Sequence, residues 1–220
     1  MPGLTPLLLA DGRFPAGGYA HSGGLEAACH EGLTGDQVAA YLRARLHAVT
    51  AAECALAVAA GRETAVDTLL LLDEEATARL PSPTLRAVSQ RLGSQLLRTA
   101  SVVWPEAAVP RAYRAASTST PRTVAFGVVA RAAGLDELDL ARGFLYDDAA
   151  MVAAAAVKLL PVDVLSTTRL LVELEEDLER LALAAVSLNV PPRELPSAFA
   201  PLLELRSLAH GRREGRLFAS

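Results

Sequence analysis

The histidines and cysteines of this sequence could bind a transition metal, but their spacing does not favour such a site. They are His21, Cys29, His30, His47, Cys54 and His210. None forms a Cys-x-x-Cys or His-x-x-x-His pattern, which would place two ligands on one turn or one helix face. His47 and Cys54 share a helix face but stand about 10.5 Å apart along the axis, at about 1.5 Å per residue. We therefore expect no metal site within a single chain and no resident cofactor.

Familiar catalytic motifs are also missing from the sequence. There is no Gly-x-Ser-x-Gly nucleophile elbow. Lys158 is the only lysine, so a phosphate-binding loop that ends in Gly-Lys-Ser/Thr cannot occur. The carboxylates follow helical surface patterns, where solvated charge is the ordinary interpretation. We expect no catalytic residue and a protein that is not an enzyme.

The segment 11–26 combines residues that suggest a shaped loop followed by a helix. Pro15 fixes one φ angle, and four glycines allow backbone angles that a β-carbon would forbid. We expect Ser22 or Gly23 to cap the helix, with Glu26 in its first turn near the free N–H groups. The segment is either a binding loop or a tight turn whose aromatic side chains fill the core. The candidate binding residues here are Phe14, Tyr19, His21, Ser22 and Glu26.

A polar stripe on a later helix is a second candidate. In the helix expected over residues 85–103, Arg91, Gln95 and Arg98 recur at i, i+4 and i+7, opposite the leucines. This stripe is either a solvated face or an interface, because planar guanidinium and amide groups hydrogen-bond well to a partner.

The C-terminal tail, residues 206–220, is the third candidate. It is basic on an acidic protein, with four arginines against Glu214, and it ends in apolar side chains. Glycines weaken any helix near Arg212. We therefore expect the segment from about Arg212 to be loosely packed in the free protein and to become ordered on a partner. The candidate binding residues of the tail are His210, Arg216, Leu217 and Phe218.

Composition indicates a soluble, cytoplasmic protein. The 220 residues are 51% apolar but only 5% aromatic, so the core must be built from Ala, Leu and Val. A net charge of −4 argues against binding nucleic acid through global charge. The two cysteines make no disulfide framework and suit a reducing compartment. No apolar run approaches the roughly 18 residues that span a bilayer, so we expect no membrane segment.

Helical periodicity recurs along the whole chain, without a β-hairpin signal or an internal repeat. We predict an all-α, single-domain multi-helix bundle of about eight to ten helices over residues 1–220, with a partner-binding tail at about 206–220. Thr34, Thr64, Asp136 and Asp163 are expected to cap helices. Residues 149–157 are apolar all round, which predicts a central buried helix. The predicted helices cover about 25–31, 38–61, 64–80, 85–103, 123–134, 136–160, 163–188 and 202–208, with a poor helix and a loop between 105 and 123.

Four segments resemble the family of UreF urease accessory proteins. Pro15-x-Gly17-Gly18-Tyr19-x-His21-Ser22-x-Gly24-Leu25-Glu26 resembles the N-terminal signature of that family. Gly93-x-Gln95-Leu96-Leu97-Arg98, Val124-x-Phe126-Gly127 and the ending with His210 and Arg216-Leu217-Phe218 are similar to three further family segments. Together the resemblance runs from about residue 7 to the end. The tail departs from the usual family pattern at Gly211 and Ala219.

The resemblance implies an all-helical, non-catalytic, dimeric chaperone of urease maturation. In this family the protein links a UreD/UreH-type accessory protein to the GTPase UreG, so that nickel is inserted into apo-urease. The loop, the stripe and the tail would then be partner-binding surfaces. The alternative is a regulator of the GTPase, in which an exposed arginine such as Arg91 or Arg98 activates hydrolysis or checks its fidelity. A helical enzyme of another kind is the generic alternative.

Overall fold

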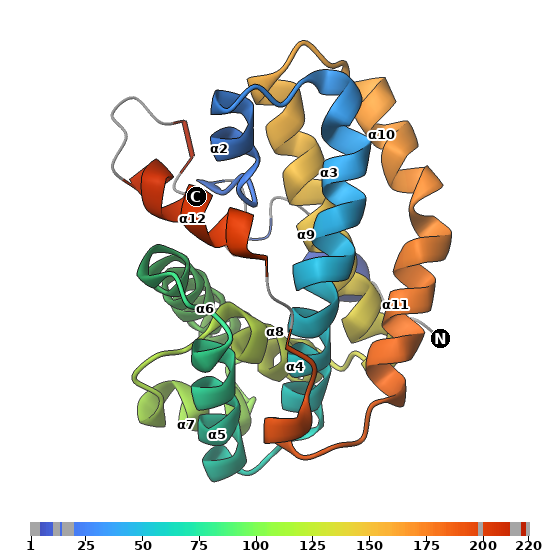
Figure 1. The fold of residues 1–220 in the computed structure, drawn as a ribbon. Helices are drawn as coiled ribbons and strands as arrows, with labels where there is room; N and C mark the ends of the chain where they lie inside the picture. The colour runs from blue at the N-terminus through green and yellow to red at the C-terminus, as the bar shows by residue number, and fades with distance from the viewer. Residues whose placement is uncertain (1–4, 11–13, 15–19, 198–199, 212–216, 219–220) are drawn as a thin grey trace.

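Helices account for all the regular secondary structure in the computed structural model, which describes residues 5–10, 14, 20–197, 200–211 and 217–218 (Figure 1). The α-helices are α1 (Thr5–Ala10), α2 (Leu25–His30), α3 (Val38–Arg45), α4 (Ala51–Arg62), α5 (Val66–Ala78), α6 (Pro83–Val103), α7 (Ala108–Ala116), α8 (Arg122–Ala132), α9 (Glu137–Leu159), α10 (Val164–Glu173), α11 (Glu175–Ser187) and α12 (Pro201–Gly211). The shorter helices are η2 (Gly35–Gln37), η3 (Leu46–Thr50) and η4 (Pro192–Glu194). If α3–η3–α4 and α10–α11 each count as one helix, the described residues form ten α-helices besides the short η2 and η4, which confirms the predicted all-α single-domain bundle.

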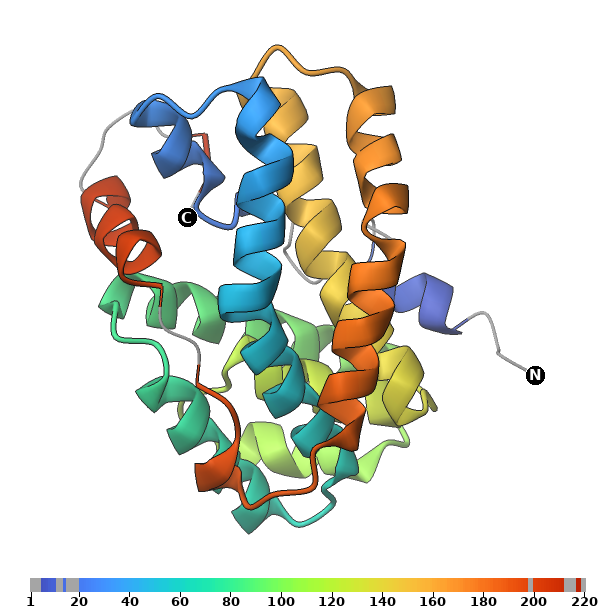
Figure 2. The same ribbon diagram turned by 45° about the vertical axis from the view of Figure 1, so that its right-hand side comes forward.

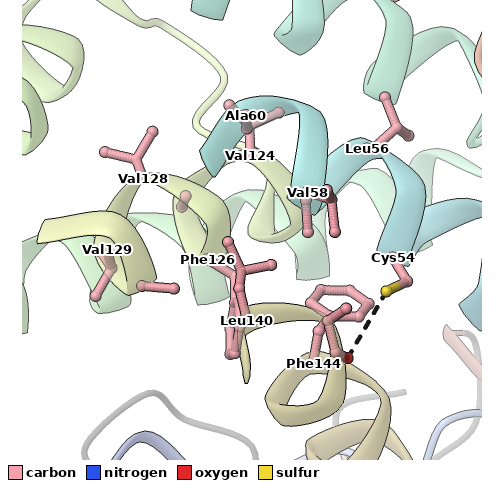
Figure 3. Close-up of a cluster of buried hydrophobic side chains, with 14 of the residues drawn as sticks. Cys54, Leu56, Val58, Ala60, Val124, Phe126, Val128, Val129, Leu140 and Phe144 are labelled. Carbon is pink, nitrogen blue, oxygen red and sulfur yellow. Dashed lines mark hydrogen bonds between the residues drawn. The ribbon is translucent and has the colours of Figure 1, made fainter. Parts of the chain in front are cut away.

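Helix α8 lies at the centre of the larger hydrophobic cluster. All its residues from 123 to 130 are buried. Helix α4 crosses it at a glycine, because a Cβ on Gly127 would lie 2.1 Å from the carbonyl oxygen of Ala57. From α9, Phe144 meets Phe126 edge to face, with ring centroids 5.2 Å apart (Figure 3). The prediction of a buried helix over residues 149–157 holds for most of the segment, since α9 packs against α4, α10 and α11 and is exposed there only at Ala154.

A second hydrophobic cluster joins α2, α3, α9 and α10 in the upper half of Figure 1. Helices α10 and α11 follow one another almost end to end, and both pack along α9 (Figure 2). Phe218 of the tail also belongs to this cluster. Phe218 therefore packs on the body of the chain.

Three of the five predicted helix caps are confirmed. Thr34 forms the capping box of η2, and the side chains of Asp136 and Asp163 accept the N-terminal hydrogen bonds of α9 and α10. The prediction for Thr64 is wrong, because Ala65 precedes α5 and no side chain caps that helix. Among the described helices, none combines the length and the apolar character needed to cross a membrane.

Candidate partner-binding site

The predicted loop enters α2 through two glycines with left-handed backbone angles. Gly23 has φ 62° and Gly24 has φ 84°. A Cβ on Gly24 would lie 2.4 Å from Cδ1 of Leu203 on α12, so the turn is also closely packed. Gly24 is the N-cap, not Ser22 or Gly23 as predicted. The hydroxyl of Ser22 nevertheless accepts a hydrogen bond from the N–H of Glu26 at 3.2 Å, which helps to fix the start of the helix.

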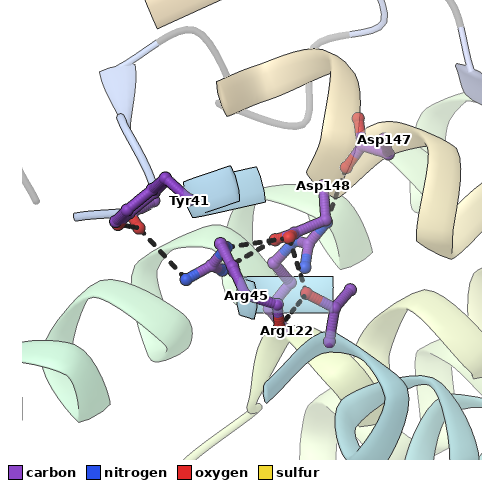
Figure 4. A network of polar contacts seen from close by, with 7 residues as sticks. Tyr41, Arg45, Arg122, Asp147 and Asp148 are labelled. Carbon is purple, nitrogen blue, oxygen red and sulfur yellow. Dashed lines mark hydrogen bonds and ion pairs between the residues drawn. The ribbon is translucent and has the colours of Figure 1, made fainter. Parts of the chain in front are cut away.

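A buried ion pair connects this loop to α3 and α9 (Figure 4). The carbonyl oxygen of Gly23 accepts hydrogen bonds from Tyr41 Oη at 2.8 Å and from Arg45 Nη1 at 3.1 Å. Arg45 also donates through Nε and Nη2 to both carboxylate oxygens of Asp148, at 2.9 and 2.8 Å. Thr50 donates to the same carboxylate at 2.8 Å. The exposed fractions of the paired side chains are 11% for Arg45 and 1% for Asp148. Each charge therefore has its partner, and little water, to compensate the cost of its burial.

The pKa values of these groups follow from burial and pairing. Burial alone would raise the pKa of Asp148, but the positive charge and hydrogen bonds of Arg45 outweigh it and lower that pKa below its usual value. Burial acts against the charged form of Arg45, and Asp148 raises its pKa above the usual value. Burial raises the pKa of Tyr41 to about 12, so its phenol stays protonated and donates to the loop. Arg45 and Asp148 are therefore both charged at neutral pH.

A second ion pair stands at the start of α8. Arg122 donates to Asp147 at 2.6 Å, and its guanidinium lies 4.7 Å from the centroid of the Phe144 ring. The predicted loop residue His21 is buried nearby. Burial, together with the positive charges of Arg91 and Arg122, lowers the pKa of His21 to about 4. The imidazole is consequently neutral at pH 7.

A cavity of about 90 Å³ lies between the loop, α6, α8, α9 and α12. Its polar lining consists of His21, Arg45, Glu53, Ser89, Arg122, Thr123, Asp148 and Glu204. Burial raises the pKa values of Glu53 and Glu204. The hydroxyl of Thr123 is buried without a hydrogen-bond partner among the described residues. Within the described ranges, no group of three or more His, Cys, Asp and Glu side chains is placed to hold a metal ion.

Leu217 and Phe218 of the tail bind to Glu26 in the first turn of α2. The carboxylate of Glu26 accepts hydrogen bonds from the backbone N–H groups of Leu217 at 2.6 Å and Phe218 at 2.9 Å. His210 Nε2 lies 3.1 Å from the carbonyl oxygen of Phe218. Phe218 is 5% exposed and Lys158 lies over its ring, 5.4 Å from the centroid. The expectation of a loosely packed tail is therefore wrong for Leu217 and Phe218, and it lies outside the described residues for 212–216 and 219–220.

The predicted binding residues thus fall into a buried and an exposed group. Phe14, His21, Ser22, Glu26, His210 and Phe218 are buried. Arg91, Arg98 and Leu217 are exposed, and Gln95 is half-buried. Tyr19 and Arg216 lie outside the described residues. Phe14 packs against Trp104 with ring centroids 6.2 Å apart, so its contact is with the core.

The arginine stripe faces outward because the opposite face of α6 is in close contact with the chain. A Cβ on Gly93 would lie 1.9 Å from the carbonyl oxygen of Thr120. This contact fixes the rotation of α6 and leaves Arg91 and Arg98 on the surface. The stripe and the loop are also neighbours, because the charge of Arg91 contributes to the lowered pKa of His21.

Sequence reasoning missed the network of Arg45, Thr50 and Asp148. Arg45 and Asp148 are 103 residues apart, so no local spacing could have paired them. The available signal was Asp147-Asp148, two acidic residues directly before the apolar segment 149–157. A carboxylate next to such a segment is expected to need a buried partner.

Comparison with known proteins gives a consistent match over the whole chain. The family model for UreF matches residues 33–175. The urease accessory protein UreF of Mycobacterium sp. (strain JLS) is 36% identical over 225 residues, covering all of both chains. The protein of the same name from Mycolicibacterium vanbaalenii is 34% identical over 98% of both chains, and that from Mycobacterium marinum is 35% identical over 97% of both.

Proposed function

Because the chain belongs to the UreF family of urease accessory proteins, we propose that it is a non-catalytic scaffold in the assembly of the urease metallocentre. The full-length similarity to proteins named UreF is the observation that carries this proposal. The scaffold links a UreD/UreH-type protein to a UreG-type GTPase, and their complex delivers nickel to apo-urease in the cytoplasm. It works as a homodimer. Nickel is the cargo of the complex, and this chain contributes no resident cofactor and no strong nickel site of its own.

The distribution of arginines supports a binding role for the outer face of α6. Arg45 and Arg122 form ion pairs in the interior, where they hold helices together. Arg91 and Arg98 instead project from a 21-residue helix whose rotation Gly93 fixes. A rigid helix presents side chains to a partner at a low cost in conformational entropy.

Co-purification tests the proposal. The chain should form one complex with the UreD/UreH-type protein and the GTPase when all three are co-expressed, as measured by size-exclusion chromatography with light scattering. Arg91→Ala and Arg98→Ala should each weaken capture without changing the melting temperature, since exposed substitutions rarely affect stability by more than about 0.5 kcal/mol. Arg169→Ala on α10, whose side chain is 82% exposed, is the matched control. If wild-type protein forms no complex with either partner, the proposed function is wrong.

A further inference from the structure

Positive charge is concentrated in α6 and α7. Residues 83–116 contain five arginines and one acidic residue, whereas the rest of the chain contains 16 basic and 24 acidic residues. Neither helix contains Asp or Glu. Both helices lie on the left of Figure 1, and the acidic helix α11 lies on the right. These two helices are therefore basic although the net charge of the protein is negative, and the neighbouring helix α5 carries Asp67, Asp73, Glu74 and Glu75.

Three exposed residues of α6 and the half-buried Gln95 form one stripe. Arg91, Gln95, Arg98 and Val102 are separated by steps of four, three and four residues, which place them on one side of a helix. Val102 is 78% exposed, so the stripe ends in an apolar side chain that nothing in the described chain covers. A protein interface commonly combines arginine with apolar contacts in this way.

Helix α7 extends this stripe into a wider face. Arg111 and Arg114 are exposed on α7. Arg114 Nη1 lies 3.5 Å from Oγ of Ser101, one residue before Val102, so Arg114 lies against the C-terminal part of α6. The docking face consists of Arg91, Gln95, Arg98, Val102, Arg111 and Arg114.

The four arginines of the docking face differ from many other exposed arginines of the protein in having no acidic partner. Arg142, Arg169 and Arg180 each form an ion pair with a neighbouring carboxylate. Within the described part of the chain, no ion pair involves an arginine of the docking face. Four unpaired guanidinium groups on two adjacent helices repel one another, and an opposite charge from outside would relieve that repulsion.

We propose that α6 and α7 together form one docking face for an acidic surface of a protein partner. The inference extends the predicted stripe to α7 and assigns the chemistry of its partner, and it rests on the proposed function in naming the partner as a member of the urease assembly. Guanidinium groups bind carboxylates through two parallel hydrogen bonds. A protein fits better than a nucleic acid, because the exposed valine lies in line with the arginines and can contact an apolar side chain of a partner.

The test compares two double charge reversals of equal size. Arg98→Glu/Arg111→Glu changes the docking face, and Arg43→Glu/Arg193→Glu changes two other exposed arginines, on α3 and η4. Fluorescently labelled poly-L-glutamate is the independent probe, titrated with the full chain at low and physiological salt. We expect the docking-face variant to lose at least tenfold in affinity and the control variant less than twofold. Binding should also weaken as salt rises, since the screening length falls to about 8 Å at 0.15 M.

Capture of the two purified assembly partners completes the test. At least one of them should lose about tenfold in affinity with the docking-face variant only. If both partners bind this variant as they bind the wild type, the inference is overturned and the proposed function stands. If neither partner binds the wild type, the proposed function fails, and the polyglutamate titration alone decides the chemistry of the face. Equal polyglutamate binding by all three proteins overturns the inference, as does tighter binding of poly-U RNA than of polyglutamate at physiological salt.

Discussion

Removal of the Asp148 carboxylate should destabilise the fold by about 3–5 kcal/mol, the range expected when one member of a buried ion pair is lost. The carboxylate accepts two hydrogen bonds from Arg45 and one from Thr50. In Asp148→Ala, the guanidinium of Arg45 would remain about nine-tenths buried, and among the described residues only the carbonyl oxygen of Gly23 would still accept a hydrogen bond from it. The large effect therefore comes from the charge left behind more than from the hydrogen bonds removed.

The surface ion pair of Arg142 and Glu179 provides a control with the same chemistry. Arg142 donates to both carboxylate oxygens of Glu179, at 2.7 and 2.6 Å, as Arg45 does to Asp148. The two side chains are 47% and 39% exposed, so water replaces the lost partner. Glu179→Ala should therefore destabilise the fold far less than Asp148→Ala. Both variants should be unfolded in urea at pH 7 and followed by far-ultraviolet circular dichroism, with the wild type as reference.

A double variant separates charge from packing. Arg45→Met/Asp148→Leu removes both charges and should recover most of the stability lost in Asp148→Ala, because apolar side chains of similar volume often replace a buried pair at little cost. If Asp148→Ala costs no more than Glu179→Ala, the buried pair does not hold the loop and the reasoning is refuted. A double variant as unstable as Asp148→Ala would contradict the assignment of the cost to the unpaired charge.

Three further predictions follow from the described contacts. Phe218→Ala should lower the free energy of unfolding by about 2 kcal/mol, while Leu217→Ala, at a side chain 63% exposed, should change it little in the same urea titration. The pKa of His21 is lowered to about 4 in the folded state, so the unfolded chain binds a proton at this histidine more readily. Stability should therefore fall as the pH drops from about 6.5 to about 4, and it should fall less in His21→Gln. If the melting temperature of His21→Gln depends on pH as that of the wild type does, this prediction is contradicted. Gly127→Ala should lower the free energy of unfolding by about 3 kcal/mol or more, since the new Cβ would meet a backbone oxygen at 2.1 Å. At Gly143 the nearest atom to a new Cβ is 3.8 Å away, so Gly143→Ala should instead stabilise α9 by up to about 1 kcal/mol. Equal effects of the two substitutions would contradict the packing argument.

Local chemistry made most of the helices predictable from the sequence. Apolar residues every three or four positions place the helices, and Asp136 and Asp163 mark the starts of α9 and α10 through bonds within four residues of themselves. The error at Thr64 is also local, because Ala65 is the N-cap of α5 and no side chain hydrogen-bonds to the first turn of that helix. Periodicity could not show how completely α8 is enclosed, since that depends on its crossing with α4 at Gly127.

The candidate site was less predictable because burial is a property of the whole fold. Glu26 has the expected position in the first turn of α2, and a carboxylate there is ordinary on a free surface. Its partners are the N–H groups of Leu217 and Phe218, more than 190 residues later. No local pattern could have distinguished a carboxylate that is free to bind another protein from one that binds the tail of its own chain. The exposed stripe was predictable, because three positions of a single helix define it.

The buried and exposed groups of predicted binding residues have complementary roles. The carboxylate of Glu26 holds the backbone of Leu217 and Phe218, and the paired charges of Arg45 and Asp148 hold the loop, so these groups already have partners inside the protein. A charge that is already paired and buried can attract a partner only weakly, since its field is largely cancelled. The unpaired guanidinium groups of Arg98 and Arg111 have no such compensation, and they stand on helices that the core holds rigid. Recognition by charge should therefore depend on the docking face, while substitutions in the buried network should reduce partner binding only in proportion to the loss of folded protein.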